Sequence, residues 1–404
     1  MNSIPLIIPY LDDREAQAIQ RVLQSGWVTQ GPETATFESE FAASVGSPYA
    51  CAVSNCTTAL HLALQVVGVQ PGGEVITVSH SFIATANSIR YCGAVPVFVD
   101  IDRATYNLDP TRLEQAITPR TQAILCVHQM GMPCDLTSIL QFAKRHGLPV
   151  VEDAACAIGS EVLSNGRWEH IGKPHGDVAC FSFHPRKVIT TGDGGMLTTA
   201  NSEYDRRFRL LRQHGMTVSD ITRHHARQVV FEEYQCLGYN YRLTDVQAAM
   251  GRQQLLKLPE ILRRRRLLAA RYRELLADQK DVTLPAEPSW ARSNWQSFCI
   301  RLADQLDQKQ VMQSLLEQGV ASRRGIMCAH REPTYQREVW FCPQCGRHPH
   351  PVRQPCSHLR HSEKAQDQSV ILPLYPQMTD KEQNLVVEAL RQACCHGRRP
   401  DHRG

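Results

Sequence analysis

Two charged residues in this sequence stand directly after apolar runs that are long enough to be buried strands. Asp153 closely follows the run LPVV, and a carboxylate there is costly to bury unless it meets a cation. Lys187 lies in FSFHPRKVITTGDGGM, where partial desolvation would lower the pKa of its amine and make it a nucleophile toward a carbonyl carbon. Each residue also has a plainer interpretation, because Asp153 could cap a helix and Lys187 could be an exposed loop lysine.

Two further stretches offer groups that bind anions and flat rings. In SNCTTALH a strand-like segment turns into a helix near Cys56, where backbone N–H groups can hold phosphate and the hydroxyls of Thr57 and Thr58 can add hydrogen bonds. Phe82 follows another apolar run, and its ring could stack on a planar cofactor. The alternatives are simple helix capping by Asn55 or Thr57, and packing of Phe82 in the core.

Together these four features fit one cofactor, pyridoxal 5'-phosphate. Its aldehyde needs an amine, its pyridinium nitrogen needs a carboxylate, its phosphate needs an anion site and its ring needs a stacking face. The carboxylate keeps the ring nitrogen protonated, so that the ring accepts electrons when the Cα proton of a substrate leaves. No single feature is specific, and it is the combination that indicates this cofactor.

The elements that must position these residues alternate between strands and helices through the first half of the chain. Five short runs are nearly continuous in apolar residues, which is typical of strands covered on both faces. They are residues 74–80, 95–101, 123–129, 148–154 and 177–184. Between them, residues 56–68 carry the apolar stripe of a helix, and residues 135–147 begin with Asp135 as N-cap and end at Gly147. This alternation predicts an α/β fold with a mostly parallel sheet, whose carboxyl strand ends carry the reactive groups.

The alternation of short strands and helices ends near residue 250. Residues 248–279 predict a long helix that contains Pro259 and the run RRRR at 263–266. A basic run of this kind could bind nucleic acid, but the leucines around it favour the solvated face of a linking helix.

Three more elements predict a smaller α+β domain at the C-terminal end. They are a strand at 297–302, a helix around 306–318 and a closing helix at 379–395. We therefore divide the chain into a large, cofactor-binding domain at 1–250 and a small domain at 251–404.

Composition excludes several classes of protein. The chain has 404 residues, 42% hydrophobic and 21% charged, which supplies a full core and excludes disordered, collagen-like and disulfide-stapled proteins. The net charge of +4 does not suggest nucleic-acid binding, and no apolar stretch approaches the length of a membrane span. The N-terminus shows no secretory signal, so the fifteen cysteines are expected to be reduced thiols of a cytoplasmic enzyme.

Seven blocks of the sequence carry a resemblance to a known family. They are SGWVTQGPETATFESEFA (25–42), VSNCTTALHLAL (53–64), GAVPVFVDID (93–102), VEDAACAIGS (151–160), FSFHPRKVITTGDGGM (181–196), LRQHG (211–215) and GYNYRLTDVQAAMG (238–251). In this order they resemble the sugar aminotransferases of the DegT/DnrJ/EryC1/StrS family, from about residue 5 to 330 and again at 369–379. The resemblance implies a fold-type I pyridoxal-phosphate transferase, with a mostly parallel seven-stranded sheet in the large domain and a smaller C-terminal α+β domain.

The resemblance also implies roles for individual residues. Lys187 would form the internal aldimine and then carry the proton of the 1,3-shift, Asp153 would pair with the pyridinium nitrogen, and Phe82 would stack on the ring. The phosphate would be held by the hydroxyls of Thr57, Thr58 and Ser182. An asparagine of the neighbouring subunit completes the phosphate site in this family, and Asn240 occupies that place, which implies a homodimer with shared active sites.

The implied activity is amino-group transfer by a ping-pong aldimine/ketimine mechanism. Glutamate or glutamine would donate the amine, and the acceptor would be a keto group of a nucleotide-linked deoxysugar or a keto-cyclitol. Acceptor choice would depend partly on residues 321–335, where Arg323, Arg324 or His330 could either touch an anionic acceptor or belong to the solvated surface.

Two other functions were weighed against transamination. A 3-dehydratase branch of the family carries histidine at the lysine position, so Lys187 argues against it. The other is a scaffold or regulatory protein that has lost catalysis and binds a partner through a Cys/His-rich insert. Cys56 keeps that alternative open, because it stands where the family has glycine in the phosphate turn. A separate departure is Cys156, which stands where glutamine or histidine is common beside the ring hydroxyl.

The largest departure from the family pattern is the insert at about 339–361. Cys342 and Cys345 have the CxxC spacing of a zinc knuckle, and Cys356, His358 or His361 could complete a tetrahedral site. One CxxC is only half of such a signal, so we assign no metal ligand and favour a Pro/His-rich surface loop with reactive thiols. A bound metal would have a structural role, because the cofactor performs the chemistry.

Overall fold

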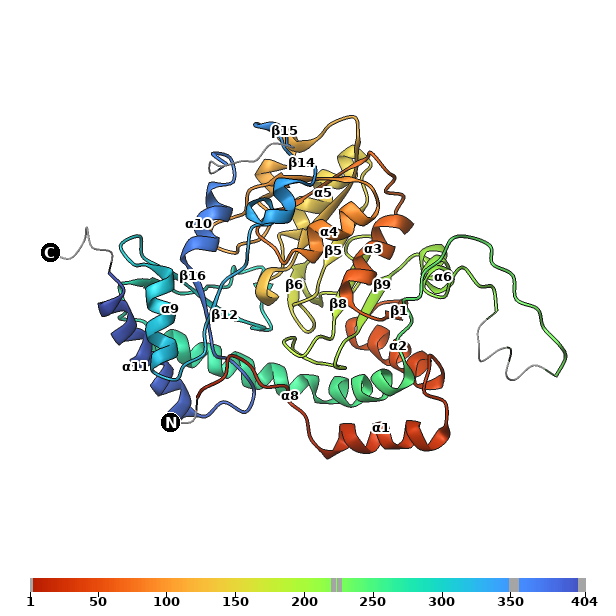
Figure 1. Ribbon diagram of the computed structural model, residues 1–404, viewed down its shortest axis with the longest axis horizontal. Coiled ribbons are helices and arrows are strands. Elements are labelled where there is room, and N and C mark those ends of the chain that lie inside the picture. Colours follow the sequence, from red (N-terminus) through yellow and green to blue (C-terminus); the bar gives the residue numbers. More distant parts are fainter. Residues whose placement is uncertain (1–2, 219–222, 224–226, 349–355, 399–404) are drawn as a thin grey trace.

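The computed structural model describes residues 3–218, 223, 227–348 and 356–398, and Figure 1 shows how their helices and strands are arranged. A large sheet flanked by helices forms one part of the molecule, and the C-terminal elements gather at the other end of the long helix α8. None of the helices in the described ranges is both long and apolar enough to cross a membrane.

The large sheet has nine strands in the order β1-β9-β8-β5-β4-β2-β3-β14-β15. Its strands are β1 (Tyr49–Val53), β2 (Glu74–Val78), β3 (Val95–Val99), β4 (Thr121–Val127), β5 (Val150–Asp153), β8 (Val178–Ser182), β9 (Gly195–Thr199), β14 (Trp340–Cys342) and β15 (Gly346–His348). Strands β3, β2, β4, β5 and β8 run parallel to one another, as the sequence predicts. At one edge β9 pairs antiparallel with β8, and β1 pairs antiparallel with β9. The seven strands implied by the resemblance are thus present, but the insert adds two more.

The insert is an ordered extension of this sheet in the residues that the structure describes. Phe341 of β14 pairs in parallel with Val97 of β3, and β15 pairs antiparallel with β14. The Trp340 ring packs 5.5 Å from the Phe98 ring, centroid to centroid, in an apolar cluster that also holds Cys342. The predicted surface loop is therefore wrong for these residues, because the edge of β3 offers unpaired backbone groups and an apolar face. Part of the insert, residues 349–355, lies outside the described ranges.

Helices cover the large sheet on both faces. They are α2 (Pro32–Val45), α3 (Cys56–Val66), α4 (Ala84–Tyr91), α5 (Leu136–His146) and α6 (Ser202–Leu211), whereas α1 (Asp13–Ser25) packs on α8. Neighbouring residues of β2, Val75 and Ile76, enter two different hydrophobic clusters, one on each side of the sheet. This two-sided burial is why the predicted strands are apolar at nearly every position.

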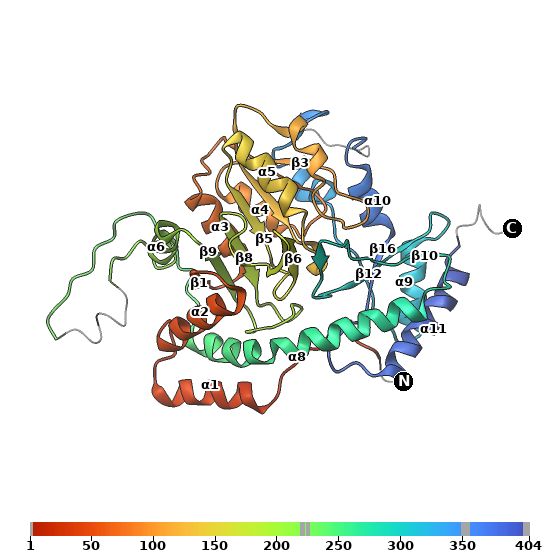
Figure 2. The same ribbon diagram turned by 180° about the vertical axis from the view of Figure 1, so that it is seen from behind.

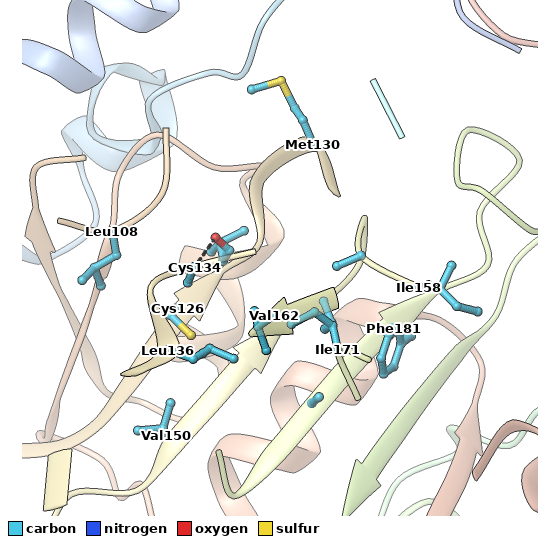
Figure 3. Close-up of a cluster of buried hydrophobic side chains, with 14 of the residues drawn as sticks. Leu108, Cys126, Met130, Cys134, Leu136, Val150, Ile158, Val162, Ile171 and Phe181 are labelled. Carbon is cyan, nitrogen blue, oxygen red and sulfur yellow. Dashed lines mark hydrogen bonds between the residues drawn. The ribbon is translucent and has the colours of Figure 1, made fainter. Parts of the chain in front are cut away.

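Figure 3 draws part of the cluster on the α5 side of the sheet. Cys126, Val150 and Phe181, from strands β4, β5 and β8, lie there with Leu136 of α5. Helix α5 begins and ends where the sequence predicts, because Asp135 accepts a hydrogen bond from Ser138 N at 3.0 Å and Gly147 adopts a φ of 63°.

The C-terminal part has its own sheet and core. Its strands are β10 (Val282–Thr283), β12 (Phe298–Leu302), β13 (Arg323–Arg324) and β16 (Ser369–Leu372), and its helices are α9 (Gln308–Glu317), α10 (Arg360–Gln368) and α11 (Asp380–His396). A third small sheet joins β6 (Glu161–Ser164), β7 (Arg167–His170) and β11 (Ala291–Arg292). Short 3-10 helices occupy Pro110–Arg112, Glu114–Ala116, Gln129–Gly131, Ala329–Arg331 and Pro333–Gln336.

Helix α8 (Asp245–Leu275) runs along the base of the molecule and links the two parts, as Figure 2 shows from behind. It continues through residue 250, so the domain division at that point stays a prediction. The predicted solvated face of its RRRR run is wrong for Arg265, which is only 1% exposed. The Arg265 guanidinium donates to the carbonyls of Trp295, Gln296 and Leu374, at distances of 3.0, 3.2 and 3.2 Å. The basic run therefore binds the C-terminal part to the helix.

Candidate active site

Asp153 is the last residue of β5, and its carboxylate is buried at the carboxyl end of the parallel strands. The Thr85 hydroxyl donates to Asp153 Oδ2 at 2.8 Å, and the Ala155 backbone N–H donates to Oδ1 at 3.2 Å. Turns, not a helix, follow Asp153, so helix capping does not explain this carboxylate. Burial raises the pKa of Asp153 above its ordinary value, although Thr85, Ala155 and nearby Lys187 oppose the shift. A cation facing the carboxylate would favour its charged form.

Lys187 lies on the turn after β8, and its amine points inward rather than into solvent. Its Nζ donates to Cys156 Sγ at 3.1 Å, and its backbone N–H donates to the His184 carbonyl at 2.8 Å. Burial lowers the pKa of the Lys187 amine, but the Cys156 sulfur and the Asp153 carboxylate raise it, and the net pKa lies above its usual value. The desolvation expected from the sequence is present, whereas the lowered pKa is not, because the hydrogen bond to the Cys156 sulfur and the charge of Asp153 stabilise the ammonium form.

The start of α3, where the sequence predicts an anion site, lies beside these two residues. Asn55 caps the helix by accepting from Thr58 N at 2.9 Å, which confirms the capping alternative for Asn55. The Thr58 hydroxyl donates to the Asn55 carbonyl at 2.7 Å, so it has no hydrogen left for a phosphate and serves the cap instead. Thr57 is half-buried and its hydroxyl makes no hydrogen bond within the described residues, so it stays the candidate donor of the pair.

The side chain of Cys56 does not enter this turn. Its thiol donates to the Cys180 carbonyl at 3.6 Å, and the side chain belongs to the hydrophobic cluster beneath α3. Gly195 of β9 passes so closely that a Cβ there would lie 2.9 Å from Cys56 N. The side chain at position 56 therefore does not occupy the turn, although glycine is absent there.

Ser182 and Phe82 lie at strand ends next to this turn and to Asp153. Ser182 ends β8, and its Oγ accepts from His184 N at 3.4 Å, while its hydroxyl donates to no residue in the described ranges. The Phe82 ring is 64% exposed, so core packing is wrong for it. Its carbonyl accepts from Thr85 N at 3.1 Å, which ties Phe82 to the residue that orients Asp153. An exposed ring in this position fits a stacking role.

Asn240 is exposed on a segment that follows α6. Tyr239 N and Tyr241 N donate to the carbonyls of Leu211 and Arg212 at 2.7 and 2.9 Å. The Tyr241 carbonyl in turn accepts from Ser54 N at 2.8 Å, next to the phosphate turn. The structure describes a single chain, so delivery of Asn240 to a partner's site stays a prediction.

The structure gives three residues of this site roles that the sequence does not predict. Thr85 orients the carboxylate, Cys156 accepts from the lysine amine, and Gly195 permits the close approach of β9. Among the candidate acceptor contacts, His330 is buried and bonded to Ser79 and Glu363, and Arg324 pairs with Glu332 at 3.1 Å. Only Arg323 of those three is exposed and has no side-chain hydrogen bond or ion pair among the described residues.

The site's residues fit pyridoxal phosphate on their own chemistry. A lysine amine, a buried carboxylate, a helix start with accessible N–H groups and an exposed ring converge at one end of the sheet. The buried carboxylate has only neutral hydrogen-bond donors, and a pyridinium nitrogen would supply the missing cation.

Comparison with known proteins gives consistent matches over nearly the whole chain. The model of the DegT/DnrJ/EryC1/StrS aminotransferase family matches residues 9–391. The spore coat polysaccharide biosynthesis protein SpsC of Bacillus subtilis (strain 168) is 37% identical over 393 residues, which are 96% of each protein. The S. venezuelae DesV structure in complex with a ketimine intermediate is 32% identical, has a TM-score of 0.83 and covers 98% of this chain and 99% of its own. A PLP-form structure from Streptococcus pneumoniae is 26% identical, with a TM-score of 0.85 and coverage of 97% and 98%.

Proposed function

Because the chain belongs to the DegT/DnrJ/EryC1/StrS aminotransferase family, we propose that it binds pyridoxal 5'-phosphate and transfers an amino group to a keto sugar. The donor is glutamate or glutamine, and the acceptor is a keto group of a nucleotide-linked deoxysugar or a keto-cyclitol, in two half-reactions of ping-pong type. The observation that carries the proposal is the meeting of the Lys187 amine and the Asp153 carboxylate beside the α3 start.

When bound, the cofactor supplies an electron sink for the carbanion that forms when a substrate loses its Cα proton. Lys187 would hold the cofactor aldehyde and then move a proton at its Nζ atom, which the Cys156 sulfur orients at 3.1 Å. Asp153, held by Thr85 and Ala155, would keep the ring nitrogen protonated. The N–H groups at the start of α3, with Thr57 and Ser182, would bind the phosphate.

The active unit is a homodimer with shared sites. Residues 227–237 belong to an arm that extends away from the rest of the chain in both views, and Val229, Phe231 and Leu237 on it are 84%, 86% and 88% exposed. Apolar side chains on such an arm are stabilised by packing against a second copy. The arm leads to Asn240, which we propose binds the phosphate in the partner's site.

The enzyme works in the cytoplasm. All fifteen cysteines lie in the described ranges, and none forms a disulfide. This pattern supports a reducing compartment.

Absorbance of the purified protein tests the proposed function. Addition of pyridoxal phosphate should give a visible band that borohydride fixes and that glutamate bleaches, and the Lys187→Ala variant should not give the borohydride-fixed product. The bleached enzyme is then offered keto-sugar nucleotides and keto-cyclitols, and aminated products are sought by mass spectrometry. No chromophore in the wild-type protein would favour the scaffold alternative, and an acceptor outside both classes would overturn the substrate assignment.

A further inference from the structure

The insert brings three cysteines together at the open edge of the large sheet. Cys342 ends β14, Cys345 lies in the turn before β15, and Cys356 comes shortly before α10. Cys356 Sγ lies 3.8 Å from Cys342 Sγ and 3.6 Å from Cys345 Sγ, and all three sulfurs lie within 4.8 Å of one another. Figure 1 shows β14 and β15 at the end of the sheet away from α8.

These sulfur separations match a tetrahedral thiolate site. With zinc–sulfur bonds of about 2.3 Å and tetrahedral angles, neighbouring ligand sulfurs are about 3.8 Å apart. A disulfide would require about 2.05 Å, so none of the three pairs is bonded in this arrangement. A third thiol, Cys356, that meets the two thiols of the β14–β15 hairpin is more than a CxxC pattern, and the sequence left this third ligand open among three residues.

A backbone hydrogen bond closes the turn that carries the first two of these cysteines, because Cys345 N donates to the Cys342 carbonyl at 3.2 Å. Metal binding itself requires the thiols in their anionic form.

We propose that Cys342, Cys345 and Cys356 bind a structural zinc ion. Thiolate ligands select zinc over the harder divalent ions, and a site built from thiolates at the edge of the sheet fits a structural role. Water or the imidazole of exposed His358 completes the tetrahedron. His361 is not a ligand, because its side chain lines a separate hollow with Arg103 and Tyr106.

The ion would anchor the insert to the loop that presents Phe82. Cys356 N donates to Glu363 Oε1 at 2.9 Å, and the same oxygen contacts His330 Nε2 at 2.9 Å. His330 Nδ1 lies 2.6 Å from Ser79 Oγ, three residues before Phe82. The zinc site thus stabilises a buried chain of contacts that ends beside the cofactor region, and it needs no cofactor to form.

Metal analysis of the purified full-length protein tests this proposal. We expect about one zinc ion per chain by plasma mass spectrometry after dialysis against metal-free buffer. Cys345→Ser should lose the ion while the exposed side chain tolerates the change, and Cys395→Ser, another exposed cysteine, should keep it. Zinc below about a tenth of an ion per chain after growth with added zinc would overturn the proposal, as would full zinc retention by Cys345→Ser.

A second measurement uses the wild-type protein and so does not depend on folding of a variant. A mercurial reagent titrated against the native protein should release zinc in step with modification of the three insert cysteines, followed by a chromogenic chelator and by peptide mapping. Release should also lower the melting temperature, because metal-binding free energy is folding free energy. A disulfide between any two of the three cysteines in the freshly purified protein, or another metal in the site, would contradict the assignment.

Discussion

The substitution Asp153→Asn tests the central electrostatic claim about the site. Asn has the shape of Asp and can keep both hydrogen bonds. Its amide oxygen accepts from Ala155 N, and its amide N–H donates to Thr85 Oγ1 once that hydroxyl turns its hydrogen toward Ser81 Oγ, 2.7 Å away. The change therefore removes a charge and leaves the contacts in place.

The magnitude follows from what the charge does. A neutral amide cannot hold a proton on the ring nitrogen, and loss of one preorganised electrostatic contact costs about 100-fold or more in rate. That factor corresponds to about 2.7 kcal/mol of transition-state stabilisation. We expect kcat to fall by at least this factor with folding intact, measured with glutamate in single-turnover bleaching of the bound cofactor.

The same variant, which lowers the reaction rate, should raise the stability of the cofactor-free protein. Because burial raises the pKa of Asp153 in the folded state, the folded protein binds this proton more tightly than the unfolded chain does. The contribution of Asp153 to stability is therefore full below its ordinary pKa and is lost as the pH rises through the raised value. Cofactor-free Asp153→Asn should be more stable than wild type at neutral pH, and this advantage should vanish in acid.

Two results would refute this reasoning. An Asn variant within a few-fold of the wild-type rate would mean that the carboxylate does not act on the ring nitrogen. Equal stability of both cofactor-free proteins at neutral pH in urea titrations would mean that the carboxylate is not buried as a charge. Asp100→Asn serves as the control, because this carboxylate at the end of β3 caps α10 through Ser362 N at 2.8 Å and faces no cofactor group. It should lower stability and leave kcat unchanged.

Three further predictions address other links of the argument. Lys187→Ala should abolish turnover but keep the circular dichroism spectrum of the wild type, because it removes both the nucleophilic amine and the proton carrier; near wild-type transamination would contradict it. Lys187→Ala mixed with Asn240→Ala should regain up to about half of wild-type activity per hybrid dimer, because one of its two sites has both residues. Subunit exchange seen by native mass spectrometry without any recovery would place Asn240 in its own chain's site. Arg265→Met should cost at least about 3 kcal/mol in urea titrations, because it leaves two buried carbonyls and one part-buried carbonyl unpaired, whereas the exposed Arg263→Met should stay within about 0.5 kcal/mol. Equal losses in the two arginine variants would show that burial does not set the cost.

The parallel strands were predictable because burial on both faces produces a nearly continuous apolar run in the local sequence. Val75 and Ile76 belong to different cores, so β2 is buried at every position and is mostly apolar, and the run can be recognised without knowing its neighbours. Strands β14 and β15 have no such apolar run of strand length. Each has three residues, and their position depends on the edge that β3 leaves open for pairing at Val97. Which distant segment a strand pairs with cannot be predicted from the composition of the strand or from its hydrophobic periodicity.

Arg265 shows the same limit in a charged residue. Four arginines in a row look alike in sequence, and the leucines around them fix only the apolar side of the helix. Which arginine is buried depends on carbonyls from Trp295 and Leu374, which only the folded C-terminal part brings to the helix. Burial lowers the pKa of Arg265 to about 10, so it remains charged at neutral pH and the carbonyls must compensate that charge.

Cys56 is the position where sequence and structure lead to different conclusions about function. In sequence, a side chain in place of glycine at a phosphate turn suggests a blocked site and favours a protein without catalysis. In the fold, position 56 is the first residue of α3, and its side chain turns toward β8, where the thiol donates to the Cys180 carbonyl. Gly195 of β9 packs against the same turn, and a Cβ there would lie 2.5 Å from the Asn55 carbonyl oxygen. Because the Cys56 side chain belongs to the apolar cluster beneath α3 and does not enter the turn, Cys56 is no longer an argument for a scaffold.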